Sequence, residues 1–101
     1  MKSVGATLRG LRNSRHLLIR EVAAQVKMDQ TLLSKIERDE RLPTEEQLKA
    51  FMKFYKQEGN DILLAYLSDK VIQELADQPL AIEAIHLAEQ KIQLSKVNKR
   101  K

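Results

Sequence analysis

Arginine is concentrated in the first part of this chain. Residues 43–90 contain none, whereas residues 1–42 contain Arg9, Arg12, Arg15, Arg20, Arg38 and Arg41. The planar guanidinium donates two parallel hydrogen bonds, which suits phosphate oxygens and guanine edges. Charge alone fits an ordinary solvated surface equally well, so binding to nucleic acid needs a second, independent signal.

No set of residues suits catalysis or metal binding. His16 and His86 stand alone, without a second ligand at a metal-binding spacing. The three glycines form no phosphate-binding loop, no serine nucleophile motif occurs, and the chain has no cysteine. We therefore expect no enzyme, no metal ion and no cofactor.

The length and composition exclude several classes of protein. The chain has 101 residues and a formal net charge of +4, which fits one small core. Its longest uncharged apolar stretch, residues 62–68, is far shorter than the roughly 20 residues of a membrane helix. The first 15 residues alternate apolar and basic positions, unlike a signal peptide. A membrane protein, a secreted mini-protein and a multidomain enzyme are not expected.

Helical spacing of apolar residues divides the first part of the chain into three segments. Val4, Leu8 and Leu11 predict a helix that ends near residue 15, and the apolar residues of 19–26 predict a second helix. Asp29 is positioned to cap a third helix, whose buried face would hold Leu32, Leu33 and Ile36.

Three further helices follow. Thr44 and Gln47 form a capping-box pattern after Pro43, and Gly59 is predicted to mark the end of this fourth helix. Asn60 or Asp61 is predicted to cap a fifth helix, and Pro79 is placed in the first turn of a sixth. No segment shows strand alternation, so the fold class is all-α.

The second and third predicted helices are short and separated by only a few residues, which is the layout of a helix-turn-helix. The stretch LIREVAAQVKMDQTLLSKIERDERLPTEEQLKAF resembles the Xre and phage-repressor (lambda-repressor-like) helix-turn-helix family over about residues 5–57. The resemblance implies a five-helix repressor-like domain with an additional C-terminal helix. It also implies binding to double-stranded DNA.

The resemblance assigns roles to individual residues. Base readout falls on the exposed face of the third helix, at Gln30, Thr31, Ser34 and Lys35. Glutamine can pair with adenine, lysine can donate to guanine, and the threonine methyl can contact thymine. Contacts to the DNA backbone are assigned to Arg20, Asp29, Arg38 and Arg41. The neighbouring Leu32 could either contact a base or pack against the second helix.

Two positions are predicted to form a structural ion pair. Members of this family often pair an arginine of the first helix with the glutamate that ends the third, and Arg12 and Glu37 match those positions. Removing one partner of such a pair would leave the other charge stranded.

Three positions depart from the family pattern. Ile19 replaces a phosphate-binding glutamine, so either Arg20 or the backbone amides of the second helix would bind that phosphate. Lys27 replaces the turn glycine, so it must either accept a left-handed backbone conformation or reshape the turn, at some strain. Asp39 replaces the glycine after the third helix, which is a milder change.

The second half of the chain is predicted to mediate dimerisation. We divide the chain into a DNA-binding domain (1–58), a C-terminal helical extension (60–95) and a basic, disordered tail (96–101). We expect a second copy of the chain to cover the apolar stripe of this extension; packing of the fifth and sixth helices within one chain is the alternative. The residues of the stripe are Leu67, Val71, Leu75, Ile85, Ala88 and Ile92.

These features favour a sequence-specific transcriptional regulator, a repressor or autoregulator that binds a palindromic operator as a homodimer. We expect a cytoplasmic protein of prokaryotic or phage type, without a membrane partner. The alternative is an antitoxin, or a protein like the controllers of restriction–modification operons, whose C-terminal helices bind a protein partner.

Overall fold

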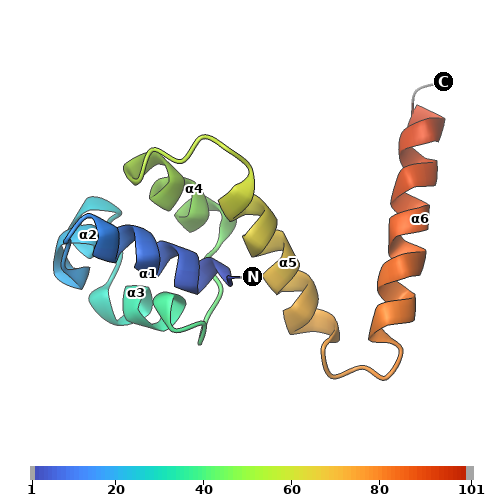
Figure 1. Ribbon diagram of the computed structural model, residues 1–101, viewed down its shortest axis with the longest axis horizontal. Helices are drawn as coiled ribbons and strands as arrows, with labels where there is room; N and C mark the ends of the chain where they lie inside the picture. Colours follow the sequence, from blue (N-terminus) through green and yellow to red (C-terminus); the bar gives the residue numbers. More distant parts are fainter. Residues whose placement is uncertain (1, 100–101) are drawn as a thin grey trace. The chain divides into compact units, whose positions relative to one another are not determined.

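The computed structural model describes residues 2–99, which contain six α-helices and no strand (Figure 1). The predicted all-α fold class is confirmed. The chain divides into two compact units, Met1–Lys70 and Val71–Lys101. The helices are α1 (Val4–Ser14), α2 (Ile19–Gln25), α3 (Gln30–Glu37), α4 (Glu45–Phe54), α5 (Asp61–Leu75) and α6 (Ala81–Lys99).

Short polar side chains cap the N-termini of three of these helices, α1, α3 and α4. The Ser3 hydroxyl accepts a hydrogen bond from the Ala6 amide at 3.0 Å, which caps α1. In α4, Thr44 and Gln47 each accept from the other's backbone amide, at 3.1 and 2.9 Å. The predicted capping box is therefore present, and it satisfies amides that have no partner inside the helix.

Four helices end in the same way, and none of them uses glycine. The residue after each C-cap has a left-handed backbone, with φ of 55° at His16, 56° at Lys27, 62° at Asp39 and 56° at Lys56. The next amide then donates back into the helix, as Met28 does to the Ala23 carbonyl at 2.9 Å. This is the Schellman motif.

The left-handed conformation predicted for Lys27 is confirmed, whereas the stop signal predicted at Gly59 is wrong. No glycine of the described chain has a positive φ, and α4 already ends at Phe54, with Lys56 in the left-handed position. The Gln57 amide donates to the Met52 carbonyl at 2.9 Å, which completes the motif. The left-handed residue is therefore Lys56, three positions before the predicted Gly59.

The core of the first unit is formed by apolar side chains from α1 to α5. Helix α3 packs against both α1 and α2. Leu32, for which the sequence left two alternatives, is half-buried and packs against this core. The buried apolar residues are Val4, Leu8, Val22, Ala23, Leu33, Ile36, Leu48, Phe51, Tyr55, Ile62 and Tyr66.

The start of α5 belongs to the first unit. Ile62 and Tyr66 are buried in the core, and the Asp69 carboxylate accepts a hydrogen bond from the Val4 amide at 2.7 Å. The boundary predicted at residues 58–60 therefore lies inside the first unit, which extends to Lys70. Burial of one face of α5 is the physical reason for this difference.

The second unit consists of the last turn of α5 and the whole of α6. Helix α6 begins at Ala81, and the Ala84 amide donates to the Leu80 carbonyl at 2.9 Å. Pro79 thus lies in the turn before α6. The sequence had predicted it in the first turn of the helix, so that prediction is wrong. Every side chain from Ile82 to Lys96 is exposed, so this part of α6 is not buried in a core.

The tail predicted to be disordered from residue 96 is helical through Lys99. No glycine or proline interrupts residues 96–99, so no residue of this segment breaks the helix. The last two residues of the predicted tail, 100–101, lie outside the described residues.

Candidate nucleic-acid interface

Helices α2 and α3 form a compact pair joined by a tight turn. The turn depends on Lys27 in its left-handed conformation and on the hydrogen bond from the Met28 amide to Ala23. Val22 and Ala23 of α2 and Leu33 of α3 are buried, so the inner faces of both helices lie in the core. The outer face of α3 remains available for another molecule.

The outer face of α3 carries the residues predicted to read bases. Gln30, Thr31 and Lys35 are exposed and Ser34 is half-buried, whereas Leu33 and Ile36 on the inner face are fully buried. Within residues 2–96, the side chains of Gln30, Thr31 and Lys35 make no hydrogen bond to the protein. The structure thus brings these four positions onto one accessible face.

Asp29 is the N-cap of α3. Its carboxylate accepts hydrogen bonds from the amides of Thr31 at 3.1 Å and Leu32 at 3.4 Å. These bonds orient the start of the helix on which the candidate readout residues stand. The predicted contact of Asp29 with the DNA backbone thus falls on a residue whose carboxylate already caps α3.

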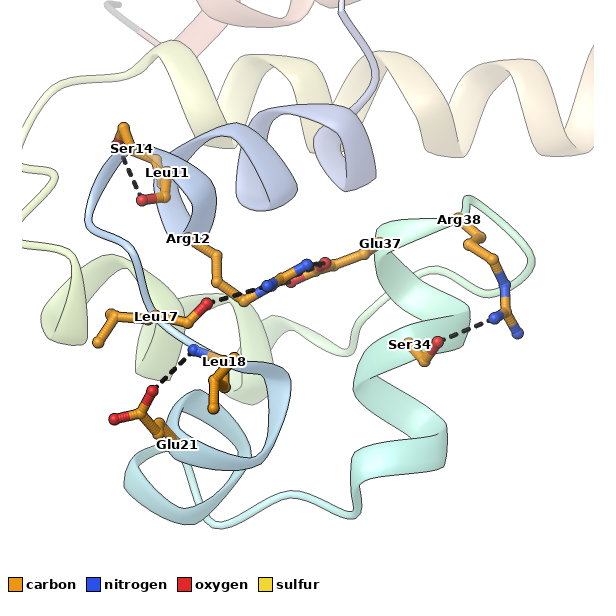
Figure 2. Close-up of polar contacts among 9 residues, drawn as sticks. All are labelled: Leu11, Arg12, Ser14, Leu17, Leu18, Glu21, Ser34, Glu37 and Arg38. Atoms are coloured by element: carbon orange, nitrogen blue, oxygen red, sulfur yellow. Dashed lines mark hydrogen bonds and ion pairs between the residues drawn. The ribbon is translucent and has the colours of Figure 1, made fainter.

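Arg12 and Glu37 are joined by an ion pair beneath the interface (Figure 2). The Arg12 Nε atom lies 2.9 Å from Glu37 Oε2, and Nη2 donates to Oε1 at 3.0 Å. Nη1 donates to the Leu17 carbonyl at 3.0 Å, and only 5% of Glu37 is exposed. The hydrogen bond with Glu37 raises the pKa of Arg12 above its ordinary value. This pair fixes α3 against α1 and against the chain that leads into α2.

Two shallow hollows lie side by side at this face, and Ile19, Ser34 and Arg38 line both of them. Arg9, Arg12 and Glu37 complete the first, which has a volume of about 160 Å³. Ile19, at the position where the family pattern places a glutamine, adds an apolar side chain to both. Arginines and the Glu37 carboxylate therefore border the surface next to α3.

The remaining residues predicted to contact the DNA backbone are exposed arginines. Arg20, in the first turn of α2, and Arg41, just after α3, are both exposed. Arg38 is also exposed, and its Nη1 donates to the Ser34 hydroxyl at 2.9 Å (Figure 2). Its Nε atom pairs with the Glu40 carboxylate.

Asp39 has a structural role that the sequence did not reveal. Its carboxylate accepts from the Ser3 hydroxyl at 2.6 Å and from the Gly5 amide at 3.2 Å, so it holds the N-terminus of α1. The sequence identified Asp39 only as a replacement for the glycine after the third helix. Because the partners lie more than 30 positions away, no local pattern could have identified them.

Arg15 is also used inside the protein. Its Nη2 donates to the Tyr55 carbonyl at 2.6 Å, and its guanidinium carbon lies 5.2 Å from the centre of the Tyr55 ring. These contacts place Arg15 at the end of α4.

Tyr55 is fully buried, and its hydroxyl finds no hydrogen-bond partner within the described part of the chain. Burial raises its pKa to about 12, and the Glu37 carboxylate adds to this shift. In an unfolded chain the tyrosine pKa is about 10. The unfolded state therefore loses this proton first as the pH rises.

Stability is expected to fall with pH between about pH 10 and about pH 12 because Tyr55 must stay protonated in the folded protein. Urea unfolding across this interval should show a steeper fall in the free energy of unfolding for the wild type than for Tyr55→Phe. At neutral pH, Tyr55→Phe should be neutral or stabilising by about 1–2 kcal/mol, since it removes an unsatisfied hydroxyl. Identical slopes for the two proteins would contradict this assignment.

The described residues lack two other kinds of site. None of the described helices combines the length and apolar character needed to cross a membrane. Residues 2–99 also contain no group of three or more histidine, cysteine, aspartate or glutamate side chains that could hold a metal ion.

Residues 3–64 match a protein family described as "Helix-turn-helix domain". The match includes all of α1 to α4 and the first residues of α5. No curated protein and no solved structure matches the chain. In the helix-turn-helix motif the second helix of the pair enters the major groove of DNA, and α3 is that helix here. The resemblance predicted from the residues is confirmed at this level, and the chain belongs to the helix-turn-helix domain family.

Proposed function

We propose that this protein is a sequence-specific transcriptional regulator that represses its target genes, or its own gene, by binding a palindromic operator as a homodimer. It acts on double-stranded DNA in the cytoplasm of a prokaryotic or phage-infected cell, and no catalysis is involved. The outer face of α3 is the observation that carries this proposal, because the side chains of Gln30, Thr31 and Lys35 are exposed there and make no hydrogen bond within the described protein.

The chemistry of that face supports base readout. Gln30 carries both a donor and an acceptor, which suits adenine, and the Lys35 ammonium group suits the acceptors of guanine. The hydroxyls of Thr31 and Ser34 can donate or accept. The Asp29 cap and the Arg12–Glu37 pair fix α3 at both ends. The helix that carries these side chains is therefore held in place before DNA arrives.

Contacts to phosphate are proposed for the arginines around this face. Arg20 and Arg41 are exposed on either side of α3 in the sequence, and Arg38 borders both hollows. Asp29 would approach the backbone only through the helix end that it caps, since its carboxylate accepts two amide hydrogen bonds. Contacts of this kind give affinity and register but no sequence preference.

Selection of binding sites from random DNA, read at two salt concentrations, tests the proposal. A regulator should enrich one motif repeated as an inverted pair, with half-sites about one helical turn apart. Its affinity should also fall steeply with salt, because bound phosphates release counterions. If the dimeric protein enriches no sequence at either salt concentration, the proposed function is wrong.

Gln30→Ala and Lys35→Ala should each relax the preference at one base pair per half-site, by about 1–3 kcal/mol. Competition binding with single-base variants of the selected site measures this effect. Lys53→Ala, on the exposed surface of α4, is the matched control and should leave every preference unchanged. Uniform weakening across all variants would instead make Gln30 and Lys35 phosphate contacts.

Dimerisation is proposed through α5 and α6. Leu67 and Val71 are exposed on a face of α5 different from the one that buries Ile62 and Tyr66, and Leu75 at its end is half-buried. Ile85, Ala88 and Ile92 are likewise exposed on α6. A helix with this much exposed apolar surface is marginal in water by itself, which supports a second copy as its cover.

Val71→Asp should weaken the dimer about 100-fold, because an unpaired carboxylate would be buried in the interface. Sedimentation equilibrium measures the monomer–dimer constant. Gln73→Asp, on another side of the same helix, adds the same charge at an exposed polar position and is the control. A wild-type protein that stays monomeric at high concentration would contradict the dimer.

A protein partner other than a second copy is the alternative, and one observation favours it. Exposed apolar side chains occur on more than one side of α6, as Ile85 and Ile92 lie on one line and Leu87 and Leu94 on another. A dimer contact that covers one line would leave the other for an antitoxin-type or controller-type partner. Retention of that partner by Ile92→Asp but not by Leu87→Asp would separate the two lines.

A further inference from the structure

Arg38 is placed between the readout face and the loop that follows α3. Its Nη1 atom donates to the hydroxyl of Ser34 at 2.9 Å, and its Nε atom pairs with the carboxylate of Glu40. About half of each charged side chain is exposed, 54% for Arg38 and 52% for Glu40. The guanidinium is thus accessible to DNA while a carboxylate of the same protein already contacts it.

The backbone holds Glu40 in this position. Asp39 has a φ of 62°, and the Glu40 amide donates to the Lys35 carbonyl at 2.9 Å, which closes the Schellman motif of α3. The Asp39 carboxylate is in turn bound by Ser3 and Gly5 of the first helix region. Glu40 is therefore fixed at the end of α3, within reach of Arg38.

We propose that Glu40 is an internal competitor for the DNA phosphate that Arg38 binds. This inference rests on the proposed DNA-binding function. A carboxylate and a phosphate present similar pairs of oxygen atoms to a guanidinium, so both can use the same donors. In the free protein Glu40 occupies Arg38, and a phosphate displaces it when α3 enters the groove.

The strength of the pair suits such an exchange. An ion pair exposed to solvent contributes little to stability, so a phosphate of the duplex can replace Glu40 without a large penalty. The exchange nevertheless lowers affinity for every duplex, because phosphate contacts carry no sequence information. The protein would then stay bound chiefly at DNA sequences whose bases also contact Gln30 and Lys35.

A double-mutant cycle with random-sequence duplex DNA at low salt tests this inference. Glu40→Gln should bind the duplex about two- to fivefold more tightly than the wild type. In an Arg38→Gln background the same change should have an effect of less than about 1.5-fold, because the group for which Glu40 competes is gone. Glu58→Gln, which makes the same change in net charge in the exposed loop between α4 and α5, is the control.

Two results would overturn the inference. An equal gain from Glu40→Gln with and without Arg38 would show that Glu40 acts only through general repulsion of DNA. An equal gain from Glu58→Gln would lead to the same conclusion. Both results differ from failure of the proposed function, in which the wild type itself would not bind duplex DNA even at low salt. Circular dichroism checks that each variant is folded.

Discussion

Arg12→Met is expected to lower the free energy of unfolding by about 3–5 kcal/mol. The methionine can fill much of the space of the arginine side chain, but it cannot donate the hydrogen bonds that Glu37 and the Leu17 carbonyl now accept. Glu37 is only 5% exposed, so its charge would remain buried without a partner. Urea unfolding at neutral pH measures the loss.

The double variant Arg12→Met/Glu37→Leu should recover most of that loss, since no stranded charge remains. Arg9→Met is the matched control, because Arg9 is an exposed arginine on the same helix. It should change the free energy of unfolding by less than about 1 kcal/mol. If Arg12→Met costs no more than Arg9→Met, the pair does not hold α3 against α1.

Gly5→Ala is expected to cost about 3 kcal/mol or more, because α1 and the end of α3 approach each other closely at this position. A Cβ atom on Gly5 would lie 2.3 Å from the Ile36 carbonyl oxygen and 2.4 Å from Asp39 Oδ1. The carbonyl belongs to the backbone of α3, so it cannot move aside without shifting that helix. The Asp39 carboxylate would also lose its place at the Gly5 amide.

Gly10→Ala provides the control for this prediction. Gly10 lies in the same helix and has no atom within 4 Å of the Cβ position. Alanine there should stabilise the protein by about 0.5–1 kcal/mol, since glycine is unfavourable inside a helix. Thermal unfolding of the two variants should thus give shifts of opposite sign. A Gly5→Ala protein as stable as Gly10→Ala would show that the close contact is absent.

Local patterns in the sequence predicted the helices well because caps and apolar spacing act over a few residues. Thr44 and Gln47 lie within one turn, and the Asp29 cap spans the same distance. Helix ends were less accurate. His16 and Lys56 take left-handed conformations that glycine usually occupies, so their side chains gave no signal of the turns they form.

Long-range contacts explain what the sequence missed. Asp39 binds Ser3 and Gly5, and Asp69 binds the Val4 amide, in each case through pairings that depend on the packed fold. The apolar residues of α5 share one helix, so spacing alone did not separate the buried Tyr66 from the exposed Leu67. The Arg12–Glu37 pair is also long-range, and it was predicted only because of the family resemblance.

We propose that the outer face of α3 is the surface that reads DNA. Titration of the isotope-labelled protein with a duplex that carries its selected site, followed by amide and side-chain NMR, tests it most directly. We predict that the largest shifts occur at Gln30, Thr31, Ser34 and Lys35, and that the shifts at Gln30 and Lys35 shrink with a duplex of unrelated sequence. Equal shifts with both duplexes, or the largest shifts on α6, would contradict the account.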